Sequence, residues 1–144
     1  QDDDKACIQA MKSIPEKISE NILNFRFRDA LFELMNLARI GNKYLAENEP
    51  WKIQATNPER VETVLYISLE ITAYLAQLME PFLPFTSATL LKMLDLEPKK
   101  WKDFLGKQIL RPGHQLREPA LLFEKIEDAV IEIQLQKLER LNLR

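Results

Sequence analysis

Trp51 is the side chain of this sequence with the clearest potential for binding chemistry, because it follows directly on Pro50. Proline fixes its own φ and biases Glu49 away from the helical region, so the turn is stiff. A stiff turn that presents a large flat ring suits stacking on an unpaired nucleic-acid base. The alternative is an aromatic that caps a helix end and fills core space. The residues alone favour that alternative, since buried aromatics outnumber base-stacking ones.

Residue types that carry catalysis or bind metals are otherwise sparse. The single histidine, His114, has no cysteine or carboxylate cluster around it at ligand spacing, which favours a surface loop residue. Cys7 lies in a helical segment without a histidine, which indicates a packed or surface thiol rather than a nucleophile. The sequence contains no glycine-rich phosphate loop. We therefore expect a chain that is non-catalytic by itself, with no metal or cofactor of its own.

The composition indicates a single helical domain. Of 144 residues 46% are hydrophobic and only three are glycine, a combination typical of helical proteins. One cysteine excludes an internal disulfide and fits a reducing, cytoplasmic compartment. No apolar run reaches the roughly 18 residues of a membrane span, and no signal peptide is visible, so no membrane partner is expected. The sequence starts without methionine, from which we expect a fragment or a processed product.

Hydrophobic spacing predicts an all-α fold, an antiparallel bundle of five to six helices forming one domain over residues 1–144. The predicted helices are 3–24, 27–48, 58–79, a short one from 86 or 87 to 94, one or two turns within 99–105, and 126–141. Pro15 inside the first helix predicts a kink or break near 13–14. Asn57 is the predicted N-cap of the third helix, with Pro58 at its first position.

The second helix, 27–48, would position the candidate site. Its predicted core-facing stripe is Phe27, Leu31, Leu34, Ala38, Gly41 and Leu45. Gly41 costs about 1 kcal/mol of helix propensity relative to alanine, for which close packing of a neighbouring helix is the expected compensation. The predicted inward residues of the final helix are Ile126, Val130, Ile133 and Leu138.

Five segments along the chain resemble the anticodon-binding domain of the methionyl-tRNA synthetase family. They are 27–30, 35–44, 49–52, 81–86 and 121–127. Together they cover most of the chain in the family's order, and Asn-Lys-Tyr at 42–44 with Glu-Pro-Trp at 49–51 carries the likeness to the methionine branch. The resemblance implies the helical fold of a class I synthetase anticodon-binding domain. It also implies recognition of the CAU anticodon loop of initiator and elongator tRNA(Met).

The resemblance also assigns site residues. In the family, the tryptophan after the proline stacks on an anticodon base, so Trp51 is expected to stack and Pro50 to shape its turn. On the preceding helix, Arg39 and Asn42 are candidates for contacts with a base edge or phosphate, and Lys43 and Lys52 for contacts with the RNA backbone. Each of these four is also compatible with an ordinary solvent-facing side chain. The stripe that carries them is Met35, Arg39, Asn42 and Ala46.

Catalysis is expected in another part of a longer parent chain, because the HIGH-like and KMSKS-like motifs of the family are missing. The resemblance implies that this parent is an ATP-dependent methionine-tRNA ligase that uses magnesium, with zinc in its catalytic domain left open. The partners of the present chain would be tRNA and that catalytic domain. The family's main base-reading asparagine–arginine pair lies upstream of residue 1, and many members carry an acidic residue where Ala46 stands. Weak, poorly discriminating binding is therefore expected.

Two alternatives remain open from the sequence. One is the homologous helical domain of a leucine, isoleucine, valine or cysteine synthetase. The other is a helical scaffold or interaction module without an RNA role. The net charge of −2 is the best support for the scaffold, since nucleic-acid modules usually carry a basic face that neutralises phosphates.

Overall fold

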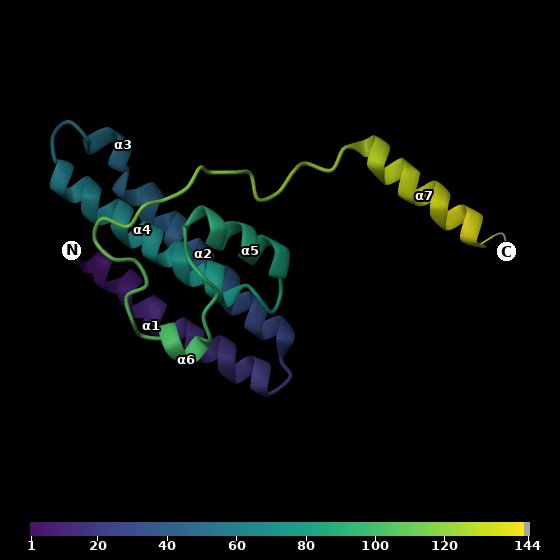
Figure 1. Ribbon diagram of the computed structural model, residues 1–144, viewed down its shortest axis with the longest axis horizontal. Coiled ribbons are helices and arrows are strands. Elements are labelled where there is room, and N and C mark those ends of the chain that lie inside the picture. The colour runs from purple at the N-terminus through teal and green to yellow at the C-terminus, as the bar shows by residue number, and fades with distance from the viewer. Residues whose placement is uncertain (143–144) are drawn as a thin grey trace.

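The computed structural model describes the backbone of residues 1–142 and the side chains of residues 1–140. The described residues form helices connected by loops (Figure 1). These helices are α1 (Asp2–Leu23), α2 (Phe27–Asn48), α3 (Pro50–Ile53), α4 (Pro58–Leu78), α5 (Pro84–Met93), α6 (Trp101–Phe104) and α7 (Asp128–Asn142). The predicted all-α bundle is confirmed. The helix not predicted is α3, a single turn that begins at Pro50.

Helices α1, α2 and α4 form the centre of the bundle, with α2 running antiparallel to the other two (Figure 1). Short connections produce this arrangement, since only residues 24–26 separate α1 from α2. Helix α5 packs on α4, and α3 contacts the N-terminal part of α4. The two ends of the α2–α3–α4 connection therefore lie together at one end of the bundle.

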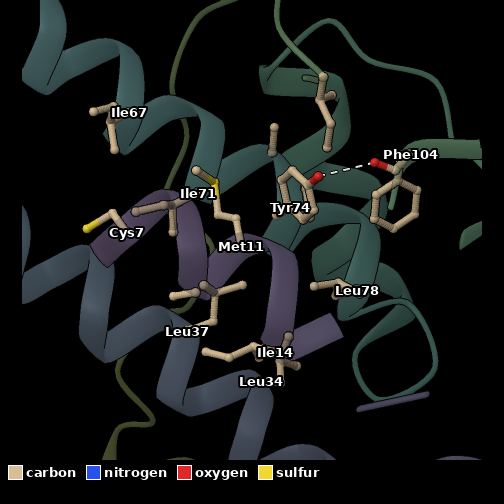
Figure 2. Packing of buried hydrophobic residues seen from close by; sticks show 14 of the residues in the cluster. Cys7, Met11, Ile14, Leu34, Leu37, Ile67, Ile71, Tyr74, Leu78 and Phe104 are labelled. Atoms are coloured by element: carbon tan, nitrogen blue, oxygen red, sulfur yellow. Dashed lines mark hydrogen bonds between the residues drawn. The ribbon is translucent and has the colours of Figure 1, made fainter. Parts of the chain in front are cut away.

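The core lies where α1, α2 and α4 meet. Figure 2 shows Met11 of α1, Leu37 of α2 and Ile71 of α4 within one cluster. Gly41 allows α2 and α4 to approach closely, because a Cβ added there would lie 3.0 Å from Cγ2 of Ile71. The close packing expected at Gly41 is thus confirmed. Burying this apolar surface is the main force that holds the three helices together.

The buried side of α2 differs in part from the predicted stripe. Its buried residues are Ala30, Leu34, Leu37 and Tyr44. The prediction was right for Leu34 and wrong for Phe27 and Leu31, which are exposed. Two adjacent apolar stripes run along this helix, and α1 and α4 cover the one that contains Ala30 and Leu37. Hydrophobic spacing alone did not distinguish the two stripes.

Helix α1 continues without interruption across Pro15, so the predicted break near residues 13–14 is wrong. A proline inside a helix removes one backbone hydrogen bond and costs about 3 kcal/mol. Pro15 is fully buried, and its neighbour Ile14 also lies in the core. Packing of this apolar part of α1 against the bundle offsets the lost hydrogen bond.

Other predicted boundaries are close to the observed ones. Asn57 caps α4 by accepting a hydrogen bond from the backbone N–H of Arg60 at 3.1 Å, as predicted. Helix α5 begins earlier than predicted, with Pro84 in its first turn, a position that proline's fixed φ favours. The carboxylate of Glu70 is buried in α4 and accepts hydrogen bonds from the backbone of Ile109 (2.5 Å) and Leu110 (2.9 Å). These bonds fasten the irregular segment after α6 to the bundle.

Helix α7 lies away from the bundle at the end of an extended segment (Figure 1). The residues predicted to face inward from the final helix are all exposed: Val130, Ile133 and Leu138 on α7, and Ile126 just before its first residue. That prediction is wrong for this structure, because an amphipathic pattern reports an apolar face and not the element that covers it.

Candidate functional site

The turn that carries the candidate site begins at the last residue of α2, Asn48. Glu49 follows in the left-handed region, with φ 40° and ψ 56°, and its N–H still donates to the carbonyl of Leu45 at 3.2 Å. Pro50 then opens α3. Proline disfavours the right-handed helical region for the residue before it, so Pro50 explains why the helix stops at this point. A non-glycine residue in the left-handed region costs of the order of 1 kcal/mol.

Pro50 and Trp51 are adjacent in the chain but differ in burial. Pro50 is buried against the bundle, whereas Trp51 keeps 60% of its surface exposed. The exposure is inconsistent with Trp51 as a core-filling aromatic. A flat ring held by a buried, rigid neighbour is what stacking on an unpaired base requires.

The stripe of α2 that leads toward this turn is also exposed. Its members are Met35, Arg39, Asn42 and Ala46. The guanidinium carbon of Arg39 lies 5.6 Å from the ring centroid of Phe32, a cation–π contact worth about 0.5–1 kcal/mol at an exposed site. This contact restrains Arg39 on the solvent side of the helix. Asn42 lies farther along the same exposed stripe, with donor and acceptor groups suited to a base edge.

The two candidate lysines are paired with neighbouring carboxylates. Lys43 lies 3.7 Å from Glu47, and Lys52 lies 2.7 Å from Glu49. Both pairs are exposed, and such pairs contribute little to stability, so either lysine can exchange its partner for a phosphate. With each lysine balanced by a glutamate, this surface has little net positive charge. Stacking and hydrogen bonding must therefore supply more of any RNA affinity than phosphate neutralisation.

Beneath the turn, a group of polar side chains joins α1, α2 and α4. The guanidinium of Arg60 donates to both carboxylate oxygens of Asp4, at 2.9 and 2.7 Å, and to Oδ1 of Asn48 at 2.5 Å. The hydroxyl of Tyr44 also donates to Asp4, at 2.6 Å. The hydrogen bonds from Arg60 hold the pKa of Asp4 well below its usual range, and burial together with the bond to Asp4 raises the pKa of Tyr44.

Sequence reasoning missed this group. Its members come from segments 12 to 57 residues apart, and neither helical spacing nor a local motif connects such distant residues. In the sequence, Asp3 and Asp4 carry only a local signal, that of acidic residues in the first turn of α1, where they suit the helix dipole. The exposed Phe32 was also missed, although its position seven residues before Arg39 places both on one face of α2.

His114 anchors a loop, and Cys7 is packed in the core. Nε2 of His114 donates to the carbonyl of Leu94 at 2.6 Å and so fastens its loop to α5. Burial raises the pKa of the Cys7 thiol to about 11, which keeps it protonated and unreactive near neutral pH. Across the described residues, no group of three or more His, Cys, Asp or Glu side chains is placed to hold a metal ion. None of the described helices combines the length and apolar character needed to cross a bilayer.

Comparison with known proteins gives a consistent result. Residues 1–139 match a family model described as the anticodon binding domain of methionyl tRNA ligase. The methionine–tRNA ligase of Cytophaga hutchinsonii is 52% identical over 136 residues, which are 94% of this chain and 20% of the relative. That of Bacteroides fragilis is 50% identical over 137 residues, or 95% of this chain and 20% of the relative. The chain thus spans about a fifth of the length of these curated relatives.

A solved structure shows the same fold. The free-state crystal structure of Mycobacterium tuberculosis methionyl-tRNA synthetase superimposes with a TM-score of 0.82 at 23% sequence identity. The superposition covers 88% of this chain and 26% of that chain.

Proposed function

The chain belongs to the family of anticodon-binding domains of methionyl-tRNA ligase, and on that premise we propose that it binds the anticodon loop of tRNA(Met), initiator and elongator, and recognises CAU. The observation that carries the proposal is the exposed Trp51 ring on the buried Pro50. One unpaired base of the loop would stack on this ring, which is worth about 1–3 kcal/mol.

The remaining candidate residues would add contacts around the stacked base. Asn42 would hydrogen-bond a base edge, and Arg39 would bind a base edge or a phosphate. Lys43 and Lys52 would leave their glutamates for the RNA backbone. Since the local charge is nearly balanced, the proposal predicts that binding by this chain weakens less with salt than binding by a strongly basic module does.

At the level of the complete protein, we propose that this domain serves an ATP-dependent methionine-tRNA ligase whose catalytic domain lies in another part of the chain. Magnesium would act with ATP in that domain, where zinc also remains an open option, and neither is assigned to residues described above. A cytoplasmic location belongs to the same proposal. Related synthetases for leucine, isoleucine, valine or cysteine are a weaker alternative, because the methionine family model matches residues 1–139.

A fluorescence titration tests the proposal. The Trp101→Phe variant leaves Trp51 as the only tryptophan, and it would be titrated at low salt with RNA stem-loops that carry CAU or a scrambled triplet. Quenching by the CAU loop that is lost on scrambling supports anticodon recognition. Equal, weak quenching by both supports stacking without discrimination. No response to either loop contradicts the proposal for this chain and favours the scaffold alternative.

A further inference from the structure

The segment that presents Trp51, residues 49–57, is anchored at both ends by side-chain hydrogen bonds. At its start, Nδ2 of Asn48 donates to Asp3 Oδ2 at 2.8 Å and to the carbonyl of Tyr44 at 3.0 Å, while Oδ1 of Asn48 accepts from Arg60. Both functional groups of this amide are therefore used. The last residue of α2 is held on one side by α1 and on the other by α4.

The end of the segment is anchored by the same arginine. Asn57 accepts a hydrogen bond from the backbone N–H of Arg60, which lies in the first turn of α4. Arg60 thus contacts Asn48, just before the segment, through its guanidinium. It contacts Asn57, the last residue of the segment, through its backbone N–H. No other residue of the described chain is hydrogen-bonded to both Asn48 and Asn57.

The guanidinium itself is fixed from α1. Arg60 and Asp4 keep only 11% and 12% of their side-chain surfaces exposed, and their pairing uses both carboxylate oxygens of Asp4. The planar fork of an arginine binds Asp4 and Asn48 at once, a geometry that a lysine ammonium does not reproduce. A partly buried ion pair of this kind loses much when one partner is removed, because the other charge stays behind without compensation.

We propose that Arg60 is a positioning residue for anticodon recognition: by joining Asn48 and Asp4 at the base of the 49–57 segment, it holds Trp51 in the orientation that a base stacks on. The inference rests on the proposed role of Trp51. Arg60 itself is too enclosed to be a principal RNA contact, so its effect on binding is exerted through the tryptophan.

The first test needs no RNA. In the Trp101→Phe background, the fluorescence anisotropy of Trp51 is compared among the parent, Arg60→Lys and Asn48→Ala, with Arg28→Lys as an exposed arginine control. We expect lower residual anisotropy, meaning a more mobile ring, in Arg60→Lys and Asn48→Ala and no change in the control. Circular dichroism confirms that each variant is folded. Should Arg60→Lys fail to fold, Asn48→Ala decides, since it leaves the Arg60–Asp4 pair intact. Unchanged anisotropy in the folded variants overturns the proposal.

The second test is a double-mutant cycle with the CAU stem-loop, measured with labelled RNA so that Trp51 can be removed. Arg60→Lys should weaken binding about threefold to tenfold when Trp51 is present and leave it unchanged in the Trp51→Ala background, as expected for residues that act together. Equal weakening in both backgrounds overturns the proposal, because Arg60 would then act independently of the tryptophan. If Trp51→Ala alone leaves CAU binding unchanged, the proposed function fails, and the RNA-free anisotropy still decides whether Arg60 positions the ring.

Discussion

Pro50 is buried while Trp51, its neighbour in the chain, is 60% exposed. The single helical turn of α3 therefore has one side chain that attaches it to the bundle and one that faces solvent. If Trp51 binds RNA as proposed, stability and recognition depend on different side chains of this turn. Substitutions at Trp51 should affect binding, whereas substitutions that alter the backbone at Glu49 or the packing of α2 should affect stability.

The left-handed conformation of Glu49 predicts an unusual preference for glycine. Glu49→Gly and Glu49→Ala both remove the exposed pair with Lys52, so their difference isolates the backbone. Alanine in the left-handed region costs roughly 1–2 kcal/mol per residue, a cost that glycine does not carry. We expect the glycine variant to be about 1 kcal/mol more stable than the alanine variant in denaturant unfolding. Equal stabilities, or a more stable alanine variant, would contradict the assigned conformation.

Gly41→Ala should destabilise the protein although alanine is the better helix former. The gain in helix propensity is about 1 kcal/mol, but the added methyl would lie 3.0 Å from the Ile71 side chain in a packed core. Overpacking of this kind typically costs 1–3 kcal/mol, so we expect a net loss of about 1 kcal/mol. Asn42→Ala, an exposed neighbour on the same helix, is the control and should change stability by less than about 0.5 kcal/mol. A stabilised Gly41→Ala variant would show that α2 and α4 accommodate the added methyl group at little cost.

Asp4 should make the free energy of unfolding decrease as the pH falls into the acidic range. Hydrogen bonds from Arg60 lower its pKa below the ordinary value of 3.8, so the unfolded chain takes up the proton first on acidification. The stabilisation is therefore complete above the unfolded pKa and is lost progressively as the pH falls below about 4. The unfolding free energies of the parent and Asp4→Asn should differ at pH 7, and this difference should narrow as the pH falls from about 4 to 3. A difference that stays constant over this range would show that folding does not shift the pKa of Asp4, which would contradict its ion pair with Arg60.

Cys7 should resist thiol reagents in the folded protein. Its side chain is buried, and its pKa is raised to about 11, so only about one thiol in a thousand is ionised at pH 8. Labelling by a disulfide reagent should be slow in native buffer and should accelerate with denaturant, because reaction requires opening of the helix packing. The fully denatured chain provides the reference rate. Fast labelling under native conditions would place Cys7 at the surface.

The sequence was sufficient for features that depend on neighbouring residues. The bounds of α2 and the start of α4 at Pro58 follow from local propensity, caps and prolines, whose effects extend over one or two turns. The residues alone favoured a core-filling Trp51, and its exposed position was expected only from the family resemblance. Close packing at Gly41 was inferred from the cost of a glycine inside a helix.

Features that depend on distant residues were missed or wrong. Arg60 gave no sequence signal, because its partner Asp4 lies 56 residues away. The predicted core-facing stripe of α2 was only partly right. Leu31 and Leu34 are equally apolar, and only the positions of α1 and α4 determine which of them is buried. Pro15 was expected to break α1, but tertiary packing outweighed its local effect.

The proposed stacking of a base on Trp51 is tested by measuring RNA binding and stability together for Trp51→Ala and Trp51→Phe. The affinity of each variant for a labelled CAU stem-loop is determined at fixed low salt, and unfolding in denaturant is followed in parallel. Loss of a stacked base predicts about 5- to 150-fold weaker binding for Trp51→Ala and a smaller loss for Trp51→Phe, which keeps an aromatic face. Stability should stay within about 0.5 kcal/mol of the parent, because the ring is exposed. Unchanged binding by a folded Trp51→Ala variant would contradict the proposal that a base stacks on Trp51.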